Sequence, residues 1–437
     1  MRSKYRMWLT GFFLTASALL LLLPASVLAQ PIVWYVNGVN GNDSNNCQTA
    51  ETACKTIGHA ISRALSGDSI MVAAATYTEN LTIGFSLNVI GSGASTTIID
   101  GGRANTVVTI STGSVVTLSD LTIRNGYASN GGGISNDGVL TISNSTLSAS
   151  FAQVSGGGIL NKGILTINSS TLSGNLAFAS IVIYAYGGGI YNGGTVTINN
   201  STLSGNTAGC GRTGCAGFGG GIYNGGELLI NNSTLDGNVA YAHFAYSEGG
   251  GIVNNGGILT ISNSTLSGNW AARGGGIFGG AVLQNSIVAY SPMGGDCNRT
   301  MSSKGYNLSS DNTCNFNGPG DLNNTDPKLG TLGSYGGPTQ TIPLLSGSPA
   351  IDAGNPSGCT DEQGHVLKTD QRGQPRPDRE DTGGCDMGAF EEQSDGGNCI
   401  PEGGACYGPG GNHCCPAPRG HHSYCSNPTG WGSCTES

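Results

Sequence analysis

The sequence predicts an all-β fold, a right-handed parallel β-helix, from an internal repeat, an alternating strand pattern and a charge-poor composition. A phrase that begins GGGI and continues through LTI-x-N-S-T-L-S-G-N opens at Gly131, Gly156, Gly187, Gly219, Gly249 and Gly274. The isoleucines that end each GGGI are separated by 25, 31, 32, 30 and 25 residues. Such a period is typical of solenoids, whose units bury their apolar side only by stacking.

The composition excludes several classes of protein. Glycine supplies 75 of the 437 residues and charged residues only 10%, against about 25% in ordinary domains, which argues against a helical protein. The net charge is −9 and the sequence has no basic stripe, so we expect no nucleic-acid partner. The sequence has no CxxC pair and few, scattered histidines, so we expect no zinc site.

Each phrase carries apolar residues at fixed offsets of six, eight and thirteen positions from its isoleucine. In the first four copies they are Leu140, Ile142 and Leu147; Leu165, Ile167 and Leu172; Val196, Ile198 and Leu203; and Leu228, Ile230 and Leu235. The fifth copy matches after one inserted residue, and the sixth only after a deletion. Because the apolar residues alternate with Thr and Ser between Gly and Asn clusters, we expect three short strands and three bends per coil.

Equivalent residues of successive coils should lie above one another, since parallel strands pair at about 4.8 Å. The isoleucines and leucines then form inward columns. A polar column is predicted at Asn144, Asn200, Asn232, Asn263 and Asn285, with Ser169 in the second copy and Asp120 ahead of the first. Each amide in that column is expected to bond to the amides above and below it.

The repeat resembles known families. GGGIYN-type repeats are similar to those of bacterial surface β-helix proteins and of polymorphic outer membrane proteins, and GDSIMVAAATYTENLTI resembles the first coil of pectate-lyase-like β-helices.

Residues 1–29 read as a secretory signal peptide, because a basic start is followed by an apolar run from Trp8 to Leu23, then Pro24 and small residues. We expect cleavage before Gln30, which leaves a net charge of −9 − 3 = −12 and no membrane span. A transmembrane anchor is the alternative, disfavoured by Pro24. Gln30 stands where a lipoprotein would need cysteine.

Residues 30–100 are predicted to form an N-terminal cap and the first coils. Ile57, Ala60, Ile61, Ala64 and Leu65 share one face of a helix that should end at Gly67 and cover the open end of the apolar column. Cys47 and Cys54 should close a small loop beside the helix.

Residues 101–304 form the predicted repeat body, with surplus length at 176–186, 207–218, 239–248 and 270–273. If the coils stack, these insertions all emerge along one edge, where Cys210 and Cys215 would cross-link the second. They carry the candidate binding residues Phe178, Tyr184, Tyr186, Phe218, Tyr241, Phe244, Tyr246 and Trp270. These rings either stack against sugar faces or dock a protein, or they fold down and bury themselves over the coils.

Residues 305–392 resemble the choice-of-anchor Q domain that ends many bacterial β-helix surface proteins. The motifs are GYNLSSDNTC, NNTDPKLG, GGPTQT, GSPAIDAG, TDQRGQPRP and CDMGAFE, in that order. The resemblance implies a C-terminal cap domain located at or outside the cell surface, and it implies no reaction. We expect disulfides between Cys297 and Cys314 and between Cys359 and Cys385.

This segment is also the most charged part of the chain. A network of arginines and carboxylates that holds a loop-rich cap together is the first interpretation. The second is a calcium site, for which Asp352, Asp370 and Asp386 are the candidates. We expect no other cofactor.

After a polar linker at 393–398, residues 399–437 carry six cysteines: Cys399, Cys406, Cys414, Cys415, Cys425 and Cys434. Their spacing resembles knottin miniproteins, and the resemblance implies Cys399–Cys415, Cys406–Cys425 and Cys414–Cys434 pairs. The spacing alone allows fifteen connectivities. A module of this size needs cross-links to fold.

An active site is harder to find. Asn324-Thr325-Asp326 and Gly364-His365 match parts of polygalacturonase motifs, but the intervening Asp361-Glu362 is too close to Gly364 to lie on another coil. Lyase chemistry needs a basic residue beside acidic calcium ligands, and the charges of the repeat body come from different columns.

We therefore expect a monomeric, extracellular or cell-surface adhesion protein without catalytic activity, which contacts polysaccharide or protein through its aromatic edge loops. The alternatives are a lyase or glycoside hydrolase acting on uronans and a passive envelope protein.

Overall fold

The computed structural model describes residues 30–180, 184–211, 213–243, 246–361, 363–378 and 384–393. It also describes three strands near the C-terminus, β39 (Ala405–Tyr407), β40 (Ser423–Cys425) and β41 (Trp431–Glu436), which form an antiparallel sheet in the order β39-β41-β40. The predicted signal peptide and the six cysteine side chains of residues 399–437 lie outside this description, so both assignments stay predictions.

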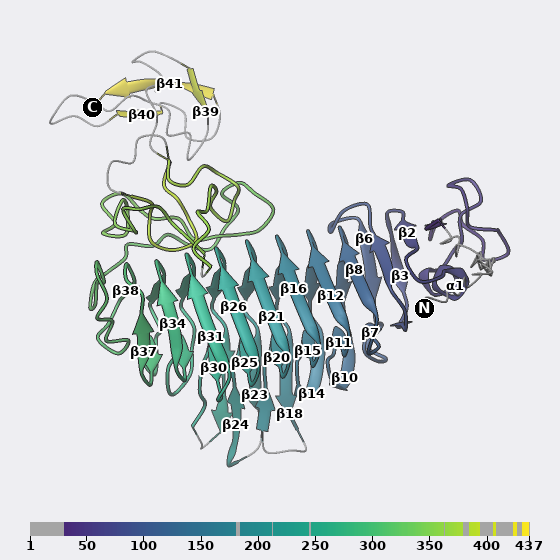
Figure 1. Ribbon diagram of the computed structural model, residues 1–437, viewed down its shortest axis with the longest axis horizontal. Helices are drawn as coiled ribbons and strands as arrows, with labels where there is room; N and C mark the ends of the chain where they lie inside the picture. Colours follow the sequence, from purple (N-terminus) through teal and green to yellow (C-terminus); the bar gives the residue numbers. More distant parts are fainter. Residues whose placement is uncertain are drawn as a thin grey trace, which may run out of the picture.

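The repeat body is a right-handed parallel β-helix, as the sequence predicts, and its three main sheets run along the stack (Figure 1). Sheet A contains β1 (Val33–Val36), β2 (Ser69–Val72), β5 (Leu87–Ile90), β8 (Val115–Ser119), β12 (Val139–Ser143), β16 (Ile164–Asn168), β21 (Thr195–Asn199), β26 (Glu227–Asn231), β31 (Ile258–Ser262), β34 (Ala281–Gln284) and β37 (Met301–Ser303). Every pair in this sheet is parallel.

Sheets B and C complete each coil. Sheet B contains β3 (Ala75–Thr78), β6 (Thr97–Asp100), β9 (Thr122–Arg124), β13 (Thr146–Ser148), β17 (Thr171–Ser173), β22 (Thr202–Ser204), β27 (Thr234–Asp236), β32 (Thr265–Ser267), β35 (Ile287–Ala289) and β38 (Leu308–Ser309). Sheet C contains β4 (Leu81–Ile83), β7 (Val108–Ile110), β11 (Ile134–Asn136), β15 (Ile159–Asn161), β20 (Ile190–Asn192), β25 (Ile222–Asn224), β30 (Ile252–Asn254), β33 (Ile277–Phe278) and β36 (Cys297–Asn298).

The predicted inward columns are present. Leu140 pairs in register with Leu165, and Leu165 with Val196, along sheet A. The leucines of sheet B and the isoleucines of sheet C stack in the same way. All of these side chains are buried in one continuous apolar core. The fixed offsets in the sequence therefore correspond to a shared register in every coil.

The predicted polar column lies at the bend between sheets A and B. Its residues have left-handed backbone, with φ near 50°, a conformation that asparagine tolerates better than most residues. Asn232 Nδ2 donates a hydrogen bond to Asn200 Oδ1 at 2.7 Å, and Asn285 Nδ2 donates one to Asn263 Oδ1 at 3.0 Å. The main reason for asparagine in this column is therefore the left-handed backbone of the bend, and hydrogen bonding between the side-chain amides is a secondary reason.

Two longer asparagine ladders lie elsewhere, and the sequence analysis missed them. One consists of the asparagines that stand two residues after the phrase isoleucines: Asn136, Asn161, Asn192, Asn224 and Asn254. Hydrogen bonds between their side-chain amides, of 2.7, 2.9, 2.8 and 2.7 Å, link each one to the next. The other links Asn175, Asn206, Asn238 and Asn269 at 3.0 Å per step. Both ladders are buried, so each amide must find its partners within the stack.

A short helix, α1 (Ile57–Arg63), covers the N-terminal end of the core, as predicted. Ile57, Ala60 and Ile61 are buried against the first coils, while Glu79 accepts hydrogen bonds from the first backbone N–H groups of the helix. Two details of the prediction are wrong. The helix ends at Arg63, because Ala64 is already extended, and Leu65 is 64% exposed because its N–H turns to bond Asp68.

The C-terminal segment, residues 311–392, does more than close the far end of the stack. Phe316 and the Cys297–Cys314 disulfide join the apolar core at that end. The rest of the segment lies along the side of the coils at the bend between sheets A and B (Figure 1). There Gln371 bonds Thr202 and Thr234, at 2.9 and 2.6 Å. The segment therefore contacts middle coils of the stack as well as its far end.

No helix in the described part of the chain has the length and apolarity needed to cross a bilayer.

Replacing Asn192 with alanine should destabilise the stack. The side chain is buried and makes four hydrogen bonds, to Asn161, Asn224, Glu227 O and Gly194 N, so its loss leaves buried partners unsatisfied. We expect the free energy of unfolding to fall by roughly 2–4 kcal/mol in urea titration. Asn199→Ala, on the outer face of sheet A, is the matched control and should cost under about 1 kcal/mol. Equal losses would contradict the ladder's structural role.

Replacing Asp236 with serine should remove a pH dependence. Asp236 stands between Ser204 and Ser267 in sheet B, and burial raises its pKa to about 6. A carboxyl whose folded pKa lies above its unfolded value binds more protons when folded, so its contribution to stability falls as pH rises from about 4 to above 6. We expect Asp236→Ser to be more stable than the natural chain by about 1–2 kcal/mol at pH 8, allowing for partial exposure.

The difference in stability between the two proteins should shrink as pH falls from about 6 and become constant well below pH 4, where Asp236 is protonated in both states. A constant difference at every pH would show that the carboxyl does not titrate as described. Thermal unfolding at a series of pH values measures both quantities.

Candidate functional site

The described parts of the insertions, residues 176–180, 184–186, 207–211, 213–218, 239–243 and 246–248, build a fin that stands out from the coils on a fourth sheet (Figure 1). Sheet D contains β10 (Tyr127–Asn130), β14 (Phe151–Ser155), β18 (Leu176–Ala179), β19 (Tyr184–Tyr186), β23 (Thr207–Cys210), β24 (Cys215–Phe218), β28 (Val239–Ala240) and β29 (Ala242–His243). All the insertions emerge along one edge, as the stacking argument requires.

Strand β14 shows how the fin arises. Its first residues pair with β18 and its last residue with β19, so one unbroken strand faces two strands of the next coil. Each insertion therefore divides a strand into an outgoing and a returning part. β18, β23 and β28 stack as an outgoing layer, and β19 and β24 stack as a returning layer.

The interior of the fin is thin. Ala177, Ala179 and Ala185 form its small core together with the Cys210–Cys215 disulfide. The disulfides Cys47–Cys54, Cys297–Cys314 and Cys359–Cys385 are also present, so all four pairs outside the six-cysteine module match the predicted ones. Because only small residues fit between the layers, the large aromatic side chains must lie on the outside of the fin.

The eight candidate residues do not form a single ridge. Tyr184, Tyr186 and Phe218 lie on the returning layer, beside sheet C. Phe178 is on the outgoing layer, and Tyr241 stacks with Trp270 at a centroid distance of 6.5 Å. Tyr246 is 65% exposed and lies under the guanidinium of Arg273, and Phe244 lies outside the described residues.

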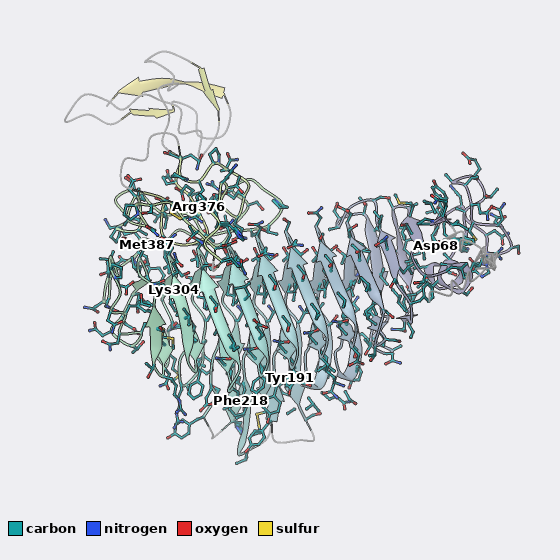
Figure 2. The ribbon with its side chains drawn as sticks, viewed as in Figure 1. Asp68, Tyr191, Phe218, Lys304, Arg376 and Met387 are labelled. Carbon is teal, nitrogen blue, oxygen red and sulfur yellow. A yellow bond between two sulfur atoms is a disulfide. The ribbon has the colours of Figure 1, made fainter. Side chains whose placement is uncertain are left out.

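The returning layer and the outer face of sheet C enclose what we call the tyrosine groove, with a volume of about 200 Å³. Its lining residues are Tyr184, Tyr186, Phe218, Tyr223, Glu248, Val253, Asn255 and Phe278. The groove lies near the lower edge of the stack in Figure 2, where Tyr191 and Phe218 are labelled.

The rings of the groove pack on one another. Tyr186 and Phe218 are stacked at 5.6 Å, and Tyr186 meets Tyr223 edge-on at 4.9 Å. Tyr223 in turn is stacked on Tyr191, one coil away, at 5.3 Å and 9° between planes. These contacts fix the orientation of each ring before any ligand arrives.

Polar groups stand at one end of the groove. Asn255 Nδ2 donates to the Tyr223 hydroxyl at 2.5 Å, and Arg273 lies 3.4 Å from the Glu248 carboxylate. Burial raises the pKa of the Glu248 carboxyl above its usual range, although Arg273 acts in the opposite direction. Burial also raises the pKa of Tyr186 and Tyr223, so both keep their hydroxyl proton.

The rings are neither fully buried nor fully free. Tyr184 is 42% exposed, and Tyr186, Phe218 and Tyr223 are half-buried. They pack against one another and remain partly exposed to solvent. This arrangement is intermediate between the two alternatives from the sequence, rings exposed for a ligand and rings buried over the coils.

Sequence analysis missed the residues that sheet C contributes to this site. Tyr191 and Tyr223 follow the phrase isoleucine directly, at the position where Leu160, Val253 and Phe278 stand in other copies. Since alternate residues of a strand face opposite sides, that position points outward. Two tyrosines at one outward position in successive copies were a usable signal.

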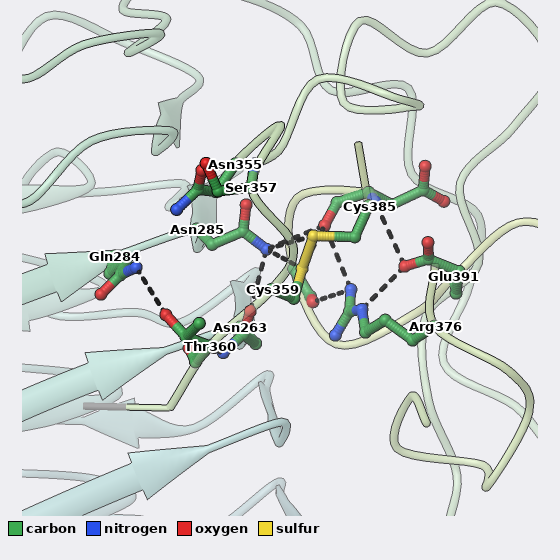
Figure 3. Close-up of a disulfide and its surroundings, with 12 residues drawn as sticks. Asn263, Gln284, Asn285, Asn355, Ser357, Cys359, Thr360, Arg376, Cys385 and Glu391 are labelled. Carbon is green, nitrogen blue, oxygen red and sulfur yellow. Dashed lines mark hydrogen bonds and ion pairs between the residues drawn. A yellow bond between two sulfur atoms is a disulfide. The ribbon is translucent and has the colours of Figure 1, made fainter. Parts of the chain in front are cut away.

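The charged residues of the C-terminal segment include two arginine–carboxylate pairs. Arg376 Nε lies 2.7 Å from Glu391 with both side chains fully buried (Figure 3). Arg372 Nε lies 2.7 Å from Asp370. This arrangement matches the first of the two interpretations of these charges.

The calcium candidates do not converge. Asp370 is committed to Arg372, whereas Asp386 accepts bonds from the backbone N–H groups of Asp352 and Glu392. Burial and the nearby Glu391 raise the pKa of Asp386 to about 7. In the described part of the chain, the three carboxylates belong to no cluster with metal-ligand geometry.

The residues that match polygalacturonase motifs lie in the C-terminal segment, after β38. Asp326 is exposed and accepts a hydrogen bond from Tyr290, and His365 Nδ1 lies 3.0 Å from Asp361 in one local turn. None of them lines the tyrosine groove.

Replacing Arg273 with glutamine should raise the pKa of Glu248 further. The cation is the largest influence opposing burial at this carboxyl, so its removal leaves the burial effect less compensated. Carboxyl NMR titration of the natural chain and the variant measures the change. Lys162→Gln, which removes a cation paired with Asp137 elsewhere on the coils, should leave Glu248 unaffected. A lower pKa in Arg273→Gln would show that the ion pair is not formed.

Comparisons with known proteins assign this chain to no family. No protein-family model matches the sequence, and no curated protein matches it at a significant level. The solved structures to which the chain is similar include pectate lyase Pel9A, at 15% identity and a TM-score of 0.39 over 83% of this chain and 96% of that one.

They also include a rhamnogalacturonan lyase, at 10% identity and a TM-score of 0.31 over 60% of this chain and 74% of that one. A third is pectin methylesterase PemA from Erwinia chrysanthemi, at 12% identity and a TM-score of 0.23 over 49% of this chain and 80% of that one. With similarity this low, we transfer no residue's role from these proteins to this chain.

Proposed function

We propose that this protein binds polysaccharide outside the cell, without transforming it, and that the tyrosine groove holds the sugar chain. The observation that carries the proposal is the cluster of five rings, Tyr184, Tyr186, Tyr191, Phe218 and Tyr223, packed beside an open groove with polar groups at one end.

The chemistry of the groove suits a sugar. The C–H face of a pyranose packs on an aromatic ring, and tyrosine adds a hydroxyl that bonds to the sugar's own hydroxyls. Glu248 and Asn255 supply further acceptors and donors at the end of the groove. Because the rings already hold one another in place, little ordering entropy opposes binding.

The absence of a second acid argues for binding over hydrolysis. Glycoside hydrolases use two carboxyl groups, roughly 5–10 Å apart, on either side of the scissile bond. Among the described residues, Glu248 is the one carboxylate that lines the groove, and Arg273 pairs with it.

The extracellular location rests on the disulfides and the sequence. Four disulfides in the described part of the chain favour an oxidising compartment. The predicted signal peptide and the resemblance of residues 305–392 to a surface-associated domain support the same location. We propose a monomer whose partner is a cell-surface polysaccharide, with a protein partner as the second choice.

A glycan array probed with the purified chain tests this function. We expect Tyr186→Ala and Tyr223→Ala to lower affinity at least about tenfold, since each removes one stacking surface and releases its neighbour. Tyr241→Ala, on the other face of the fin, is the matched control and should bind normally.

Loss of binding in Tyr241→Ala alone would move the site to the Tyr241–Trp270 pair. Binding by none of the proteins, in an array that includes uronans, would favour the passive envelope protein.

One observation favours the enzymatic alternative. A carboxyl whose pKa is raised by burial beside aromatic rings has the property required of a general acid, and Glu248 is such a group. The test is incubation of the chain with polygalacturonate and other uronans, with and without calcium. New reducing ends or unsaturated products that disappear in Glu248→Gln would establish catalysis and overturn the binding proposal.

A further inference from the structure

A second depression lies on another part of the stack, at the bend between sheets B and D. We call it the axial trough; it has a volume of about 380 Å³ and is lined by Arg103, Gly126, Tyr127, Ala149, Ser150, Phe151, Gly174 and Leu176. None of these residues lines the tyrosine groove, and none was a candidate from the sequence.

The trough runs along the stack across four successive coils. The N–H of Arg103 bonds to Asn125 O, the N–H of Asn125 to Ser148 O, and the N–H of Ala149 to Ser173 O. With coils about 4.8 Å apart, the three steps span about 14 Å. The shape therefore suits an extended ligand of several units that lies parallel to the axis.

One wall of the trough is a pair of stacked rings. Tyr127 pairs in register with Phe151, and their rings lie 4.8 Å apart with only 6° between planes. Tyr127 is the first ring of this stack and is exposed. Tyr127 and Arg103 both line the trough, so the exposed part of the Tyr127 ring offers a flat surface on which a sugar ring can pack.

The floor of the trough is open and rigid. Gly174 has left-handed backbone, and a Cβ added there would meet no atom within 4 Å. The N–H of Phe151 bonds to Gly126 O at 2.9 Å, and the N–H of Gly126 bonds to Ser150 Oγ at 3.3 Å. These bonds tie adjacent coils together, so the floor keeps its shape without a ligand.

Arg103 gives the trough its charge. The side chain is exposed, and no ion pair involves it in the part of the chain that the structure describes. The nearby Asp100 is paired instead with Arg124, at 2.8 Å. The trough thus carries one unpaired positive charge, whereas Glu248, which lines the tyrosine groove, is paired with Arg273.

We propose that the axial trough is a second binding site, specific for an anionic saccharide. A sugar ring packs on Tyr127, and its carboxylate or sulfate accepts charge-assisted hydrogen bonds from Arg103. This site is independent of the tyrosine groove, since the two are lined by different residues. Two attachment points on one rigid stack would raise the avidity of the protein for a long acidic polymer.

The test uses the full chain carrying Tyr186→Ala, which disables the tyrosine groove, and titration calorimetry with three probes. These are an oligogalacturonate, a sulfated galactan oligosaccharide and a neutral galactan oligosaccharide of the same length. We expect at least one of the two anionic probes to bind about tenfold more tightly than the neutral one, since hydrogen bonds to a charged group are stronger than those between neutral groups. The tighter anion identifies the source of the charge.

Adding Arg103→Gln should abolish the preference for the anion and its dependence on salt, and adding Tyr127→Ala should weaken all probes alike. Lys162→Gln, which removes an exposed cation elsewhere on the coils, should change nothing. Unfolding midpoints equal to that of the parent show that each variant is folded.

Equal affinity for anionic and neutral probes, an unchanged preference in Arg103→Gln, or no binding of any anion would overturn the proposal. Since every protein in this experiment lacks a working tyrosine groove, these outcomes are separate from failure of the groove itself.

Discussion

Register between neighbouring coils is the constraint on which the rest of this structure depends. Each coil buries its apolar side chains only because the next coil places equivalent residues at the same height, as Leu140, Leu165 and Val196 do. The buried asparagine ladders enforce the same register, because an amide displaced by one residue would lose every partner. Apolar contacts supply the driving force for stacking the coils, and hydrogen bonds between side-chain amides select the register.

That division leaves the outside of the stack free to vary. Insertions appear at one bend, where a strand can be divided and its two parts continue to pair with the neighbouring coil, as β18 and β19 do with the undivided β14. The fin therefore grows from the sheet instead of hanging from it as a loop. Its small core, which includes Ala177 and the Cys210–Cys215 disulfide, leaves the large rings to face outward, beside sheet C or on the opposite face.

Much of the fold could be predicted from the sequence because equivalent residues recur at fixed positions in successive coils. The columns, the common edge of the insertions and the helical cap all follow from offsets and spacing. The path of residues 311–392 could not be predicted, since it depends on single contacts such as Gln371 with Thr202, which have no period.

Only part of the candidate site could be identified from the sequence. The loop tyrosines Tyr184 and Tyr186 stand out in sequence, whereas Tyr191 and Glu248 become partners of the groove only when the fin returns beside sheet C. The axial trough combines residues from four coils, so no single stretch of sequence indicates it.

The lateral path of the C-terminal segment has a consequence for biosynthesis. Gln371 meets Thr202, and Arg376 meets Asn232, across separations of 169 and 144 residues. Neither bond is available until the middle coils exist, whereas each coil needs only the one before it as a template. The coils can therefore form in the order in which they are translated. The C-terminal segment can make its contacts with the middle coils only after those coils have formed.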